Sequence, residues 1–323
     1  MRQAGRYMPE YRDVRARLSF LKLCKDTDAA AEVTVTAVER LGADAAIIFA
    51  DILLILEPMG VGLEYPTGDG PVLHHPVRSA ADVARLPDVD AAAAVAFVYE
   101  AVRKARAALK VPLIGFSGAP FTLASYVIEG GGSRDYIRTK TFMYREPQAW
   151  HALMRRLATA VTEYLNRQIA AGVQAVQVFD SWVGCLAPHD YERFVLPYMR
   201  AVIGGVTKGV PLIHFGTGTA GLLELMRAAG GDVIGIDWRI DLGAAWRRVG
   251  YDVGVQGNLD PVTLLAPVSE IREHVARILD RVRGHAGHIF NLGHGVLPDT
   301  PVEHAIALVD MVHEMSSKSR GEL

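Results

Sequence analysis

Seven short segments rich in β-branched and other apolar residues recur along the chain, and most of them precede a stretch with a helical pattern. They are residues 44–51, 111–118, 175–181, 210–216, 232–238, 252–258 and 288–295. This alternation is typical of a parallel sheet whose outer side is covered by helices. The clearest helical stretch follows Pro147, where apolar residues repeat at three- and four-residue steps until Gly172 ends the pattern.

The sequence favours one barrel over two domains. Its 323 residues and 50% apolar composition suffice for either arrangement, but no linker rich in Pro, Gly and Ser divides the chain. No GxGxxG motif follows the first strand, so a dinucleotide-binding half is not indicated. We therefore predict a single-domain α/β fold over residues 1–323, a (β/α)8 TIM barrel that is regular or distorted. An eighth strand is not evident and would be irregular or lie between Glu57 and Leu73.

Composition and charge narrow the classes of partner. The chain has 34 basic and 36 acidic residues and a net charge of -2, which argues against nucleic acid as a partner. Only Cys24 and Cys185 are present, too few for a disulfide framework or a thiolate zinc site. No apolar run reaches eighteen residues and the N-terminus has no h-region. We therefore expect no membrane span, no signal peptide and a cytoplasmic location.

In a barrel of this kind, the carboxyl ends of the strands surround a common mouth, where active sites lie. The residues at these ends are polar and mixed: Asp51, Ser117, Gly118, Ser181, Gly216, Thr217, Asp237, Trp238, Asn258 and His294. The set lacks the several carboxylates or His pairs of a metal-binding barrel, so we expect no metal. The segment FGTGTAG, residues 215–221, either presents N–H groups to an anion or forms a tight turn.

Asp51 is the one carboxylate in the apolar run IIFADILLIL, residues 47–56. Because an ionised carboxylate is costly to remove from water, it needs a partner. Two interpretations stay open: Asp51 caps the element after the strand, or it accepts hydrogen bonds from N–H donors of a ligand. Ser181 can equally be a turn residue, and a lone His such as His294 is more often a satisfied core histidine.

The first seventeen residues contain a local basic cluster in an otherwise nearly neutral chain: Arg2, Arg6, Arg12, Arg15 and Arg17. Guanidinium groups suit carboxylate recognition because they stay charged and donate in a planar fork. The alternative is a solvated N-terminal arm. Gly5 and Pro9 favour a shaped loop over an ordinary helix face.

The order of several motifs resembles the uroporphyrinogen decarboxylase family. They are MRQAGRYMPEYR (1–12), the run from Cys24 to Leu53, GFSGAPFTLASYVIEGGGS (115–133), FDSWVGCL (179–186), QGNLDP (256–261) and NLGHGVLPDTP (291–301). Two features depart from the family. It usually has a short segment with Pro and Trp before MRQAGR, whereas this sequence starts at that Met, and it often has Gln-Pro in place of Thr36 and Ala37.

The resemblance implies a cofactor-free carboxy-lyase that converts the four acetate side chains of uroporphyrinogen III to methyl groups, giving coproporphyrinogen III in haem biosynthesis. It also implies a homodimer. Asp51 and Arg2 would be catalytic, with Asp51 accepting hydrogen bonds from the pyrrole N–H groups. Arg2 is a candidate proton donor by position, but its high pKa opposes that role, and a water held by Tyr126 or His294 is the alternative. The implied substrate-binding residues are Arg2, Gln3, Ala4, Gly5, Arg6, Asp51, Tyr126, Ser181 and His294.

Two other functions are alternatives to this one. A corrinoid- and thiol-dependent methyltransferase of the same barrel superfamily would resemble a His-x-Cys arrangement for zinc, whereas His214 is followed here by Phe215 and Gly216. A non-catalytic tetrapyrrole carrier would lack one or more of the polar mouth residues. Asp51, Tyr126, Ser181 and His294 are all present.

Overall fold

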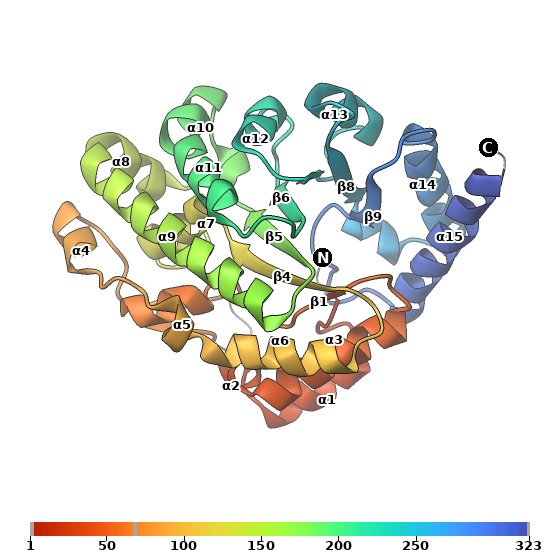
Figure 1. Cartoon of the computed structure of the whole chain (residues 1–323), viewed down its shortest axis with the longest axis horizontal. Helices are drawn as coiled ribbons and strands as arrows, with labels where there is room; N and C mark the ends of the chain where they lie inside the picture. The colour runs from red at the N-terminus through yellow and green to blue at the C-terminus, as the bar shows by residue number, and fades with distance from the viewer. Residues whose placement is uncertain (1–2, 67–69, 322–323) are drawn as a thin grey trace.

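The computed structural model describes residues 3–66 and 70–321, and its central feature is a curled sheet of seven parallel strands (Figure 1). The strand order is β1-β4-β5-β6-β7-β8-β9, and every neighbouring pair is parallel. The strands are β1 (Ala46–Ile47), β4 (Leu113–Gly118), β5 (Ala175–Asp180), β6 (Leu212–Gly216), β7 (Val233–Gly235), β8 (Gly254–Leu259) and β9 (His288–Leu292). Each coincides with one of the seven predicted segments, with β8 extending one residue beyond its segment to Leu259, so the prediction of a barrel-like α/β fold is confirmed.

Helices cover the outer side of the sheet, as the alternating pattern predicts (Figure 1). The α-helices are α1 (Pro9–Arg17), α2 (Phe20–Lys25), α3 (Thr27–Leu41), α4 (Ala80–Arg85), α5 (Ala91–Ala94), α6 (Ala96–Ala108), α7 (Pro120–Glu129), α8 (Ile137–Arg145), α9 (Pro147–Ala171), α10 (Pro188–Phe194), α11 (Leu196–Gly205), α12 (Leu223–Ala229), α13 (Leu242–Val249), α14 (Val268–Arg281) and α15 (Val302–Gly321). Short 3-10 helices are η1 (Leu54–Met59), η2 (Val183–Cys185) and η3 (Pro261–Leu265).

The predicted location of an eighth barrel strand, between Glu57 and Leu73, is wrong. In the described part of this region, β2 (Leu63–Glu64) and β3 (Val72–Leu73) form a separate antiparallel pair. Left-handed backbone at Gly60 and Gly62 turns the chain before β2, with φ of 75° and 66°. These turns prevent a continuous parallel strand, because only glycine adopts such angles at little cost. The sheet therefore ends at β1 and β9.

The free edge of β1 is partly satisfied by one side chain of the N-terminal segment. The Nε2 atom of Gln3 donates to the carbonyl of Ala45 at 2.7 Å, and its Oε1 accepts from the N–H of Ile47 at 2.9 Å. The side-chain amide thus supplies the donor and acceptor that a neighbouring strand would offer. It attaches the N-terminal segment to the sheet at its open side.

The described residues of the N-terminal segment pack against the rest of the protein. For these residues, the alternative of a solvated arm is therefore wrong. Tyr7, Met8 and Tyr11 are buried in a cluster with side chains of α14, α15 and β9. Pro9 is the first residue of α1, where its fixed φ suits a helix and its missing N–H costs nothing. The shaped-loop prediction therefore holds for Gly5, which precedes the helix, and is wrong for residues 9–17, which form α1.

Helix α9 ends where the sequence predicts. Gly172 follows its last residue with a φ of 117°, and Trp150, Leu153 and Leu157 on its apolar face are fully buried. Glycine at this position permits the left-handed turn that ends a helix. The chain then enters β5.

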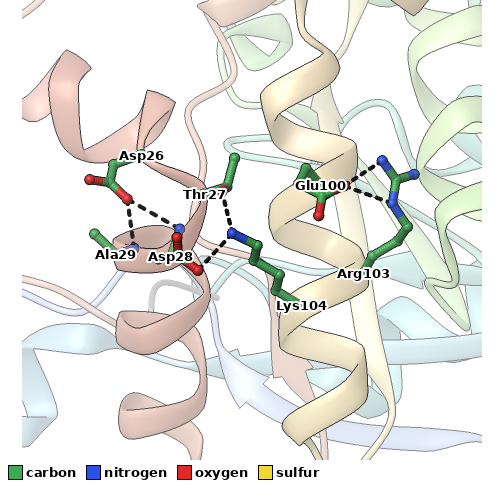
Figure 2. Close-up of polar contacts among 7 residues, drawn as sticks. All are labelled: Asp26, Thr27, Asp28, Ala29, Glu100, Arg103 and Lys104. Carbon is green, nitrogen blue, oxygen red and sulfur yellow. Dashed lines mark hydrogen bonds and ion pairs between the residues drawn. The ribbon is translucent and has the colours of Figure 1, made fainter.

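Polar contacts join helices α3 and α6 (Figure 2). Asp26 caps α3 by accepting from the N–H groups of Asp28 and Ala29, and Lys104 of α6 donates to Thr27 and Asp28 at 2.8 and 2.6 Å. Such exposed ion pairs contribute about 0–1 kcal/mol each. Burial of the apolar faces of α3 and α6 therefore supplies most of the stability here.

No helix within residues 3–66 and 70–321 is long and apolar enough to cross a membrane.

Candidate active site

The predicted mouth residues lie at one edge of the sheet. All seven strands run parallel, so their carboxyl ends share that edge. Asp51 follows β1, Ser181 directly follows β5, and His294 follows β9. Asp51 and Ser181 are partly buried, whereas His294 is exposed, so His294 is not the core histidine that a lone His usually is.

Two hydrogen bonds orient the Asp51 carboxylate at its Oδ1 atom. Its Oδ1 atom accepts from the N–H of Leu53 at 2.8 Å and from the hydroxyl of Tyr65 at 2.5 Å. The Leu53 bond is a local turn contact just before η1, whose N-cap residue is Leu53 and not Asp51. Two donors on Oδ1 hold the plane of the carboxylate, which preorganises it for a further task.

Tyr65 was not recognised from the sequence. It follows β2 and reaches back across 14 residues to Asp51, a contact that depends on the β2–β3 pair. Burial, followed by the charge of Asp51, raises the pKa of Tyr65 far above its ordinary value. Tyr65 therefore stays protonated and donates its hydrogen to Asp51.

Tyr126 belongs to an aromatic cluster between α7, α8 and the end of β5. Its ring lies 5.8 Å from the ring of Trp182, and Trp182 also lies 5.7 Å from Tyr136. Tyr126 also contributes to the raised pKa of Tyr65. The cluster thus connects the end of β5 with the surroundings of Asp51. Trp182 lies in the motif FDSWVGCL, but neither it nor Tyr136 was predicted as a site residue.

A buried carboxyl group lies directly before Ser181. Asp180 is fully buried, and the hydroxyl of Thr122 on α7 donates to its Oδ1 atom at 3.0 Å. Burial raises the pKa of Asp180 to about 7, and hydrogen bonds from Thr122 act in the opposite direction. Asp180 is therefore a carboxyl group that changes protonation near neutral pH.

Asp237 organises the ends of β6 and β7. Its Oδ2 atom accepts from the backbone N–H of Gly218 at 2.6 Å and forms an ion pair with Arg239 at 2.5 Å. Asp237 is only 1% exposed, so these charge-assisted bonds offset its desolvation. Of the two interpretations of the FGTGTAG segment, the structure supports the tight turn: Gly218 has left-handed backbone with a φ of 71°, and the N–H of Leu222 donates to the carbonyl of Thr219 before α12 begins at Leu223.

Trp238 lies between a cation and the predicted histidine. The guanidinium of Arg239 is 4.0 Å from the centre of the Trp238 ring, and the His294 ring is 6.4 Å from Trp238 on a different strand end. The stacking and the ion pair together restrict Arg239. This places a half-exposed positive charge beside the end of β7.

The N-terminal motif is held by several backbone contacts. Tyr7 donates through its hydroxyl to the carbonyl of Gln3, and Arg12 donates to the carbonyls of Arg6 and Tyr7, both at 3.0 Å. Arg6 itself is exposed, Ala4 is partly buried and Gly5 is buried. Arg2, a predicted catalytic and binding residue, lies outside the described residues.

His214, which bears on the methyltransferase alternative, is fully buried in β6. Burial lowers its pKa to about 4, so the imidazole is neutral. Within residues 3–66 and 70–321, no group of three or more His, Cys, Asp or Glu could hold a metal ion.

Comparison with known proteins identifies the family. The family model described as "Uroporphyrinogen decarboxylase (URO-D)" matches residues 1–315. The chain is 55% identical to the uroporphyrinogen decarboxylase of Carboxydothermus hydrogenoformans, over 100% of this chain and 93% of the relative. It is 54% identical to that of Roseiflexus sp., over 98% of this chain and 94% of the relative.

Similar solved structures show the fold. A methyltransferase from Methanosarcina mazei has a TM-score of 0.76 at 19% identity, covering 95% of this chain and 90% of that one. A B12-independent methionine synthase from Shewanella sp. has a TM-score of 0.61 at 14% identity, covering 92% and 89%. At these identities the likeness extends to architecture alone. The sequence matches are what decide the family, and this chain belongs to the uroporphyrinogen decarboxylase family.

Proposed function

We propose that this chain removes carbon dioxide from the four acetate side chains of uroporphyrinogen III and releases coproporphyrinogen III. Its family makes it a carboxy-lyase of tetrapyrrole biosynthesis, and the methyltransferase alternative is not favoured. The structural observation that carries the proposal is Asp51, a carboxylate at a strand end whose Oδ1 is held by Leu53 and Tyr65.

The chemistry requires a group like Asp51. Breaking the bond to the carboxylate leaves an electron pair that an electron-rich pyrrole accepts poorly. If the ring is protonated first, the pair flows into the ring as carbon dioxide leaves. A second proton then adds to the side-chain carbon and completes the methyl group, and the ring loses the first proton to become aromatic again. Asp51, as acceptor for the pyrrole N–H groups, would stabilise the positive charge of the protonated ring.

The energetics show that Asp51 does not act alone. One preorganised group of this kind is worth roughly 3 to 4 kcal/mol, whereas enzymes as a class lower barriers by about 8 to 23 kcal/mol. Orientation of the substrate by other residues must supply much of the remainder. We assign this orientation to the N-terminal motif and to the mouth residues.

The assigned binding residues are Arg2, Gln3, Ala4, Gly5, Arg6, Asp51, Tyr126, Ser181 and His294. Arg6 is exposed, which supports a role for its guanidinium in binding a substrate carboxylate. Gln3 uses both atoms of its side-chain amide on β1, which supports a role in holding the motif in place. For the proton donor, Arg2 and a water held by Tyr126 or His294 remain the two candidates.

The test is an anaerobic turnover assay of the purified chain with uroporphyrinogen III, in which the oxidised products are separated by carboxyl number. The key variant is Asp51→Asn, which keeps an oxygen acceptor but removes the charge. From the estimate of 3 to 4 kcal/mol, we expect kcat/KM to fall roughly 100- to 1000-fold. Asp26→Asn, at an exposed helix cap, is the matched control for loss of one carboxylate.

Two outcomes would contradict this proposal. Binding of the tetrapyrrole without turnover in the wild type would indicate the non-catalytic carrier instead. Wild-type activity in Asp51→Asn would remove Asp51 from the mechanism.

We also infer a homodimer and a cytoplasmic location, with no nucleic acid or membrane as partner. Both cysteines, Cys24 and Cys185, are free thiols, as suits a reducing compartment. A sedimentation mass that stays near 35.1 kDa across working concentrations would reject the dimer.

A further inference from the structure

A chain of two hydrogen bonds links β5 to α7 directly beneath the proposed site. The hydroxyl of Thr122 donates to Oδ1 of Asp180 at 3.0 Å, and the hydroxyl oxygen of Thr122 accepts from the backbone N–H of Trp182 at 3.3 Å. Thr122 and Asp180 are both fully buried. One hydroxyl thus holds the residues on both sides of Ser181.

The same hydroxyl is fixed to the element that carries Tyr126. Thr122 and Tyr126 are four residues apart on α7, so they lie on one face of the helix, one turn from each other. The Tyr126 ring contacts the Trp182 ring at 5.8 Å. Any movement of the turn after β5 relative to α7 would therefore break the Thr122 bonds and alter this ring contact together.

Burying the carboxyl group of Asp180 costs free energy, so a contribution to the stability of the fold does not explain why a carboxyl group is present at this position. The Oδ2 atom of Asp180 has no hydrogen-bond partner among the residues that the structure describes. A buried polar atom without a partner costs about 1 to 3 kcal/mol, and an apolar residue would avoid that cost. A role in placing neighbouring residues accounts for a polar group here better than packing does.

We propose that Asp180 and Thr122 are a positioning pair that fixes Ser181 and Trp182 relative to Tyr126. This inference rests on the proposed function, because Ser181 and Tyr126 are assigned there as substrate contacts. The pair does not touch the substrate. It determines the separation of two groups that do, one on the end of β5 and one on α7.

The test compares Thr122→Val with Thr122→Ser. Valine keeps the shape of threonine but removes the hydroxyl, whereas serine keeps the hydroxyl. Turnover of uroporphyrinogen III is measured at a temperature where every variant is folded. Amide hydrogen exchange at Trp182 is measured in parallel, because this readout needs no substrate.

We expect kcat/KM to fall about 10- to 100-fold in Thr122→Val, since small misplacements of binding groups have effects of this size. Thr122→Ser should recover activity to within a few-fold of the wild type. The Trp182 amide should exchange faster in Thr122→Val and at the wild-type rate in Thr122→Ser.

Three results would overturn the positioning pair: wild-type kcat/KM in Thr122→Val, an equal loss in both variants, or unchanged exchange at Trp182 in Thr122→Val. Absence of turnover in the wild type would instead contradict the proposed function. In that case, amide exchange at Trp182 still decides whether the Thr122 hydroxyl holds the turn after β5.

Discussion

Replacement of Asp180 by Asn should change how the stability of this protein depends on pH. The pKa of Asp180 is raised to about 7 by burial, from 3.8 in the unfolded chain. A group whose pKa is raised on folding contributes stability that is fully present below the unfolded pKa and is lost as pH rises through the folded pKa. The wild type should therefore lose stability from this group between about pH 4 and pH 7.

The size of the effect follows from the two pKa values. Each tenfold difference in proton binding corresponds to about 1.4 kcal/mol, so the full loss is about 4 kcal/mol. Between pH 5 and pH 8, it amounts to roughly 2 to 3 kcal/mol. Asn carries no charge at any of these pH values, so the variant lacks this loss.

Other titrating groups near Asp180 do not interfere in this range. Asp180 faces Thr122 on α7, Tyr191 on α10 and Cys185 after β5. Burial raises the pKa of Cys185 to about 11 and that of Tyr191 well above its usual value. Neither group titrates between pH 5 and pH 8.

The assay is urea-induced unfolding of the wild type and Asp180→Asn at pH 5, 6, 7 and 8. The stability of the variant relative to the wild type should rise by roughly 2 to 3 kcal/mol across this range. Asp26→Asn controls for the loss of one carboxylate at an exposed position. A relative stability that stays constant to within about 0.5 kcal/mol would refute the reasoning, since Asp180 would then carry the same charge in both states.

Two further substitutions test the architecture of the mouth. Tyr65→Phe removes a hydroxyl donor to Oδ1 of Asp51 and should lower the free energy of unfolding by about 1.5 to 3 kcal/mol, measured by urea titration. Wild-type stability would mean that this bond is not formed in solution. Gly184→Ala places a Cβ 2.2 Å from the backbone oxygen of Thr217, so it should separate the loops after β5 and β6 and lower both the melting temperature and turnover; an unchanged melting temperature would show that the loops are not in contact.

Local sequence patterns predicted much of the fold because their physical causes are local. The β-branched segments place seven strands correctly, and the repeat from Pro147 to Gly172 matches α9. Position at the strand ends also predicted which side chains share one edge. The region from Glu57 to Leu73 was misjudged because left-handed glycines and an antiparallel pair replace a barrel strand there.

The motifs of the sequence determined the family, the reaction class and the candidate residues Asp51, Tyr126, Ser181 and His294. Tertiary structure alone decided how these residues are supported. Tyr65 reaches Asp51, Thr122 reaches Asp180, and Gln3 reaches β1 across 42 and 44 residues. Such contacts leave no periodic signal in a sequence, because they depend on which strand ends and helix faces the folded sheet brings together.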